Sequence, residues 1–80
     1  MPPEPARRPL KKAVESAEKM LARLTEQMDG VLARLADPAI YSRPGTVVTE
    51  LQKEKARVER EVANAEKRWL SAQEALEAAA

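Results

Sequence analysis

Apolar residues recur along the chain in two long runs, and their spacing alternates between four and three residues. The first run comprises Leu10, Val14, Ala17, Leu21, Leu24, Met28, Val31 and Leu35. The second comprises Leu51, Lys55, Val58, Val62, Ala65, Trp69, Ala72 and Leu76, of which only the lysine is polar. This 3.5-residue period is typical of helices that pack along one stripe. It predicts one helix over residues 10–36 and another over residues 46–78.

The segment between the two runs, residues 37–46, contains residues that interrupt a helix. Proline lacks an N–H and pushes the preceding residue out of helical geometry, so Asp37-Pro38 should end the first helix. Asp37 can then cap one helical turn from Pro38 to Tyr41, and Thr46 can cap the second helix. So short a connection predicts an all-α fold, an antiparallel two-helix coiled-coil hairpin that we expect to be a monomer.

The two stripes also predict which residues face one another across the seam where the helices meet. If the hairpin is centred on Arg43, the numbers of paired residues sum to twice 43. Leu24 then faces Val62, and the large Trp69 faces the small Ala17. Because large residues meet small ones, the layers of the seam keep similar volumes, as close packing requires.

The sequence allows two roles for the tyrosine at the tip of the hairpin. Ile40 and Tyr41 should fold back over the end of the seam, against Leu35 and Leu51. Tyr41 could serve as a lid over the last hydrophobic layer or as a stacking surface for a nucleobase. The lid is favoured, because a hairpin tip must cover its last apolar layer.

Residues 1–9 hold four of the six prolines, so we expect a flexible Pro-rich linker before a hairpin domain over residues 10–80. Four basic residues cluster where this linker meets the first helix: Arg7, Arg8, Lys11 and Lys12. They could contact phosphate, or they could belong to an ordinary solvated segment. Basic side chains are disfavoured at the positive N-terminal end of a helix, so a bound anion would be stabilising there.

Composition restricts the function more than it defines it. The chain has 14 basic and 13 acidic residues, so its overall field does not select a polyanion. It contains no cysteine and no histidine, and no phosphate-binding loop of the Walker type is present. We therefore expect no enzyme activity, no cofactor and no metal site. With no apolar stretch near the length of a membrane span and no signal peptide, we expect no membrane association.

Cations nevertheless line up on the second predicted helix. Lys53, Arg60 and Lys67 occupy its outermost heptad position, Arg57 lies beside them, and Arg43 stands at the tip. We call the four residues on the helix (Lys53, Arg57, Arg60 and Lys67) the basic ridge. A ridge ~20 Å long could follow a phosphate backbone, although ordinary charge alternation on a solvated face has the same pattern. The candidate nucleic-acid-binding residues are Arg7, Arg8, Lys11, Lys12, Arg43, Lys53, Arg57, Arg60 and Lys67.

Two stretches resemble a known family. The turn Leu35-Ala-Asp-Pro-Ala-Ile-Tyr41, followed by Ala65-Glu-Lys-Arg-Trp-Leu70, is similar to the C-terminal coiled-coil domain of ABC-F ATPases, the Uup-type group above all. The chain departs from that pattern at Arg43-Pro44-Gly45, where a second Asp-Pro commonly starts the second helix.

The resemblance implies a domain at the end of a cytoplasmic protein that carries two ATP-binding cassettes. It implies that relatives bind DNA, that the family acts on ribosomes, and that residues 2–9 tether the domain to the second cassette. We therefore expect a non-catalytic domain that binds DNA or ribosomal RNA and contacts its own cassettes. The alternative is a structural spacer or a protein–protein interaction coiled coil with no nucleic-acid role.

Overall fold

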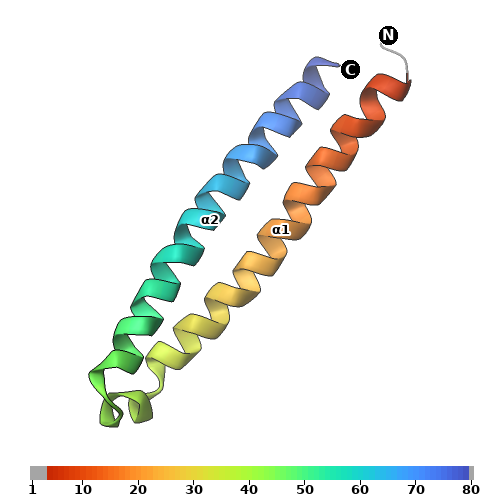
Figure 1. Ribbon diagram of the computed structural model, residues 1–80. Helices are drawn as coiled ribbons and strands as arrows, with labels where there is room; N and C mark the ends of the chain where they lie inside the picture. Colours follow the sequence, from red (N-terminus) through yellow and green to blue (C-terminus); the bar gives the residue numbers. More distant parts are fainter. Residues whose placement is uncertain (1–3, 80) are drawn as a thin grey trace.

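The computed structural model describes residues 4–79, which form an antiparallel helical hairpin (Figure 1). Helix α1 spans Glu4–Ala36, the short 3-10 helix η1 spans Pro38–Ser42, and helix α2 spans Gly45–Ala78. The two long helices lie side by side along their length, so the N-terminal end of α1 and the C-terminal end of α2 meet at the end opposite η1. The described residues contain no strand. The predicted all-α hairpin is therefore confirmed.

The seam between α1 and α2 is formed by the two predicted stripes. Every member of both stripes is buried or half-buried, and Val58 at the centre is fully covered. The buried core cluster is Leu24, Val58 and Ala65, and the half-buried residues packed against it are Leu21, Met28 and Val62. These six residues make up three pairs of the predicted register: Leu24 with Val62, Met28 with Val58, and Leu21 with Ala65.

Trp69 tests the same register nearer the open end of the hairpin. Its indole Nε1 donates a hydrogen bond of 3.4 Å to Oε1 of Glu18, the neighbour of its predicted partner Ala17. A buried or half-buried indole needs such an acceptor, because its N–H cannot otherwise be satisfied away from water. The heptad spacing therefore predicted both the contact stripe and its register.

Helix α1 begins earlier than the sequence predicts, at Glu4 instead of Leu10. The described part of the expected linker, residues 4–9, is therefore helical, and residues 1–3 lie outside the described residues. Pro5 costs little in a first turn, where backbone N–H groups have no partner within the helix. Pro9 removes one hydrogen bond, but Arg7 on its N-terminal side continues the seam stripe and is half-buried. The expectation of a non-helical segment gave too much weight to the prolines.

The turn is built as expected at its first residue. Asp37 ends α1 and caps η1, and its Oδ1 accepts a hydrogen bond of 2.9 Å from the backbone N–H of Ala39. Ile40 is 8% exposed and closes the end of the seam. Tyr41 is 62% exposed, and its hydroxyl donates a hydrogen bond of 2.8 Å to the carbonyl oxygen of Leu35. The lid is therefore Ile40, and the expectation that Tyr41 covers the core was wrong.

Helix α2 begins one residue before the predicted cap. Pro44 precedes its first residue, Gly45, and no side chain caps the helix. Thr46 lies inside the first turn instead of capping it. The fixed backbone angle of Pro44 and its missing N–H already end the turn there, which leaves no place for a cap at Thr46. Neither long helix combines the length and the apolarity that a membrane crossing would require within the described residues.

Candidate nucleic-acid interface

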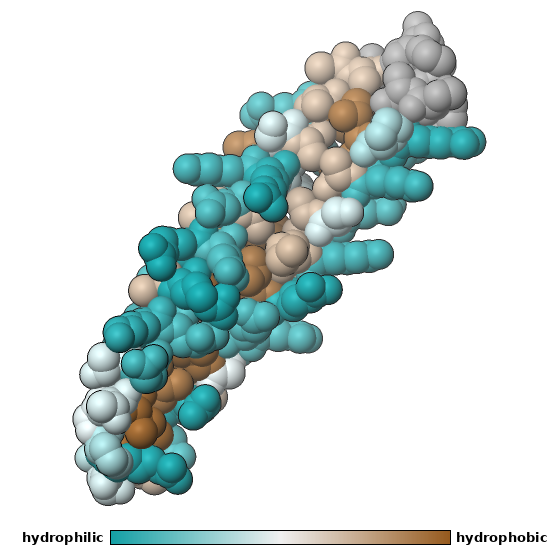
Figure 2. Space-filling view, viewed as in Figure 1, coloured by the Kyte–Doolittle hydropathy of each residue, from teal (hydrophilic) through white to brown (hydrophobic). Residues whose placement is uncertain are grey.

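The basic ridge lies on the face of α2 that points away from α1, and all four of its members are exposed. In the space-filling view, polar side chains project along the flanks of the hairpin while apolar side chains form a broken stripe between the helices (Figure 2). Arg60 and Lys67 make no ion pair within residues 4–79. The Nζ atom of Lys53 lies 3.5 Å from Oε1 of Glu50, and both side chains are 71% exposed. An ion pair so open to water is weak, so Lys53 remains available to another anion.

Arg57 differs from the rest of the ridge because two carboxylates already hold it. Its Nη2 donates to Oε1 of Glu54 at 2.6 Å, and its Nη1 donates to Oε1 of Glu61 at 2.9 Å. The hydrogen bond that Arg57 donates to Glu54 is the main cause of a raised pKa for Arg57, followed by the charges of Glu54 and Glu61. Arg57 therefore has to leave its partners before it can contact a phosphate.

The four basic residues near the start of α1 do not share one exposed face. Arg7 lies on the seam stripe, and its Nε is buried without a hydrogen-bond partner. Arg8, Lys11 and Lys12 are exposed. Lys12 occupies the outermost heptad position of α1, so it points away from the basic ridge on α2. The structure thus separates these cations from the ridge and turns Arg7 inward.

Two arginines that the sequence-based list omits lie close to listed ones. Arg68 follows Lys67 and lines two hollows along the side of the seam, of about 270 and 340 Å³. Arg34 lines a hollow of about 220 Å³ at the tip together with Arg43. The signal for Arg68 was its position next to Lys67. Arg34 is brought to Arg43 by the fold of the turn, which spacing within one helix does not show.

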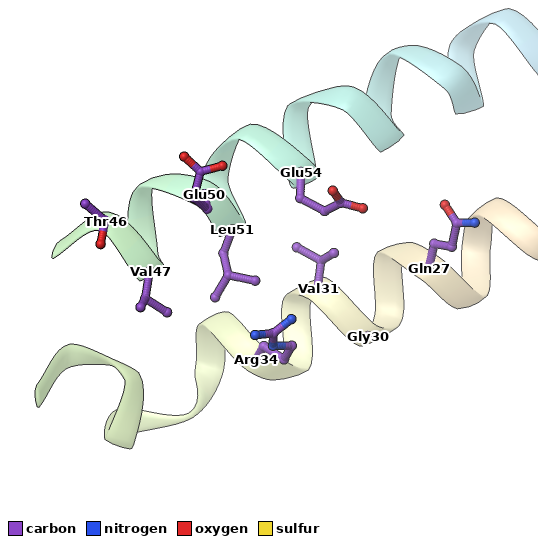
Figure 3. Close-up of a pocket in the computed structure, with 9 residues that line it drawn as sticks. All are labelled: Gln27, Gly30, Val31, Arg34, Thr46, Val47, Glu50, Leu51 and Glu54. Carbon is purple, nitrogen blue, oxygen red and sulfur yellow. The ribbon is translucent and has the colours of Figure 1, made fainter. Parts of the chain in front are cut away.

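A hollow of about 640 Å³ lies beside the seam near the tip (Figure 3). Val31 from α1 and Val47 and Leu51 from α2 point into the space between the helices (Figure 3). Polar and charged side chains of both signs complete its lining: Gln27, Arg34, Thr46, Glu50 and Glu54. Within the described residues no group of acidic side chains is placed to hold a metal ion. With two carboxylates and one arginine in its lining, this hollow lacks the net positive charge that favours phosphate.

Comparison with known families decides what the hairpin is. Residues 7–74 match the family model of the ABC transporter C-terminal domain, which includes most of both long helices and the whole turn. The chain belongs to this family. All nine candidate basic residues of this ABC transporter C-terminal domain lie inside the matched region. No curated protein and no solved structure shows significant similarity to the chain.

Proposed function

We propose that this ABC transporter C-terminal domain is a non-catalytic, monomeric nucleic-acid-binding domain that contacts phosphates through the basic ridge on α2. The observation that carries the proposal is the state of Arg60 and Lys67. They lie one heptad apart on the same outer face, are exposed, and have no carboxylate partner within residues 4–79. An exposed cation without a carboxylate partner gives up only water and salt ions when it binds a phosphate. Binding therefore carries no cost for breaking an existing ion pair.

The dimensions of the ridge support the same partner. From Lys53 to Lys67 the helix rises ~20 Å. Measured along the axis of a duplex, this length spans about six phosphates of one strand. Phosphate contacts of this kind carry no base specificity, so DNA and ribosomal RNA are both suitable partners.

The parent protein is part of the proposal as well. The resemblance of residues 35–41 and 65–70 to ABC-F ATPases supports a cytoplasmic parent with two ATP-binding cassettes. In such a protein the hairpin would hold nucleic acid near cassettes that supply the chemistry. The domain itself would contribute binding and position only.

The experiment compares two matched double variants of the domain. Arg60→Gln/Lys67→Gln removes the two unpaired cations of the ridge. Lys19→Gln/Arg23→Gln removes one lysine and one arginine that are exposed on α1. Binding to labelled duplex DNA and to a ribosomal RNA fragment is measured by fluorescence anisotropy, and folding is measured by thermal melting.

The ridge variant should bind both nucleic acids at least about tenfold more weakly, because two charge-assisted contacts are lost. The α1 variant should bind close to the parent. Both should melt near the parent temperature, because exposed charges contribute little to stability. Equal loss in both variants would show that only net charge matters. Parent-like binding by the ridge variant, or no binding by the parent, would favour the spacer or protein-interaction alternative.

A further inference from the structure

Tyr41 presents an aromatic ring to solvent at the tip of the hairpin. The chain has one tyrosine, one tryptophan and no phenylalanine, and Tyr41 is 62% exposed. Its neighbour Ile40 already covers the end of the seam at 8% exposure. The ring is therefore not required to close the core, and most of its surface faces solvent.

The exposed ring is also held in place. The hydroxyl of Tyr41 donates to the carbonyl oxygen of Leu35 in the last turn of α1. The turn that carries the ring is itself fixed by the cap at Asp37 and by the hydroxyl of Ser42, which donates to the carbonyl oxygen of Ala39 at 2.8 Å. A ring that is fixed before binding loses little conformational freedom when a ligand stacks on it.

Cations lie at the same end of the molecule. Arg34 and Arg43 are exposed, line one hollow, and make no ion pair within the described part of the chain. The carboxylate of Asp37 in that hollow already accepts the N–H of Ala39. The tip thus combines an aromatic face with two available positive charges, which is the combination that proteins use to bind single strands.

We infer that the tip is a stacking site for an unpaired nucleobase, with Tyr41 as the platform and Arg34 and Arg43 as contacts for the neighbouring phosphates. The inference rests on the proposed function, because it gives the nucleic acid bound by the basic ridge a second contact. Bases within a duplex are stacked on each other and cannot reach the ring. The domain should therefore bind strands with unpaired nucleotides more tightly than an equally charged strand without bases.

The first test uses two strands of the same length and charge. One is a mixed-sequence single strand, and the other is an abasic strand with the same phosphates and sugars. The parent domain should bind the base-bearing strand about tenfold more tightly. Equal affinities would overturn the stacking site while leaving the basic ridge intact. Failure to bind either strand would overturn both proposals.

Variants of Tyr41 separate stacking from the structural hydrogen bond. Tyr41→Phe keeps the ring and removes the hydroxyl, so the preference for the base-bearing strand should remain. Tyr41→Leu removes the ring, and the preference should fall to near unity. Arg60→Gln/Lys67→Gln serves as the control, because it should weaken binding to both strands and leave their ratio unchanged. Retention of the preference in Tyr41→Leu, or its loss in Tyr41→Phe, would contradict the role of the ring.

A direct readout does not depend on any variant. With one tyrosine, one tryptophan, no phenylalanine and no histidine, the ring protons of Tyr41 are readily assigned in a proton NMR spectrum. Addition of the base-bearing strand should shift them upfield, because a stacked base places them in its ring current. The abasic strand should leave them in place. Unchanged Tyr41 signals while the base-bearing strand is bound would overturn the inference.

Discussion

The seam and the outer face of α2 follow the same heptad spacing, yet they differ in nearly every physical property. On the seam, Val58 is fully covered and Ala65 is 4% exposed. On the outer face, Arg60 and Lys67 are open to water. Burial of apolar surface contributes most of the free energy of folding, whereas exposed charges contribute little. The hairpin therefore keeps the residues that stabilise it separate from those that we propose bind nucleic acid, so that each set can be changed without the other.

The largest expected effect comes from removing a buried side chain from the seam. Leu24 is 3% exposed within the core cluster, so Leu24→Ala should lower the free energy of unfolding by about 2–5 kcal/mol. Leu70 is 52% exposed, and Leu70→Ala should change it by less than ~0.5 kcal/mol. Urea denaturation of both variants measures the difference. A similar loss in the two would mean that the seam does not dominate stability.

A smaller effect of opposite sign is expected at the one polar residue of the two predicted stripes. Lys55 is half-buried, and its Nζ lies 3.7 Å from Oε1 of Glu59. Lys55→Leu should raise the free energy of unfolding by about 1 kcal/mol, because more apolar surface leaves water.

Lys53→Leu is the control for that change, because its side chain is 71% exposed and should gain nothing. Thermal melting compares the two variants, and sedimentation shows whether each is a monomer. Stabilisation by Lys53→Leu to the same extent would contradict the difference between the seam and the outer face.

The smallest expected effect concerns Arg57, the ridge residue that two carboxylates already hold. Glu54→Gln/Glu61→Gln releases Arg57 from both of its partners, so Arg57 can join Arg60 and Lys67 in contacting phosphate. Affinity for duplex DNA should rise a few-fold, and the salt dependence should steepen by about one phosphate contact. Glu15→Gln/Glu26→Gln removes two exposed acids from α1 and should raise affinity less. An equal rise in both would show that Arg57 makes no contact of its own.

The seam could be predicted from the sequence because its cause is local and periodic. An apolar residue every three or four positions determines which face of each helix is buried, and the short turn then determines the register. The start of α1 was not predicted, since the prolines favour a break while the stripe continues to Arg7. Near the end of a helix, the cost of a proline and the gain from one more seam contact are similar in free energy. Spacing alone therefore does not predict where the helix begins.

The sequence predicted which face of α2 carries the candidate basic residues, but not which of them are already paired with carboxylates. The sequence places Arg57 three residues after Glu54 and four before Glu61, which is the spacing of ion pairs on a helix. That spacing could have shown that Arg57 is occupied. The direction of the Tyr41 ring could not be predicted, because either Ile40 or Tyr41 can turn inward in a single 3-10 turn.

The central claim is that cations on the outer face of α2 bind a phosphate backbone, and its most direct test is the salt dependence of binding by the unaltered domain. The logarithm of the association constant for duplex DNA is plotted against the logarithm of salt concentration, starting at about 50 mM. Two to four phosphate contacts predict a slope between about −2 and −4. A slope near zero, or no binding at the lowest salt concentration, would contradict the account.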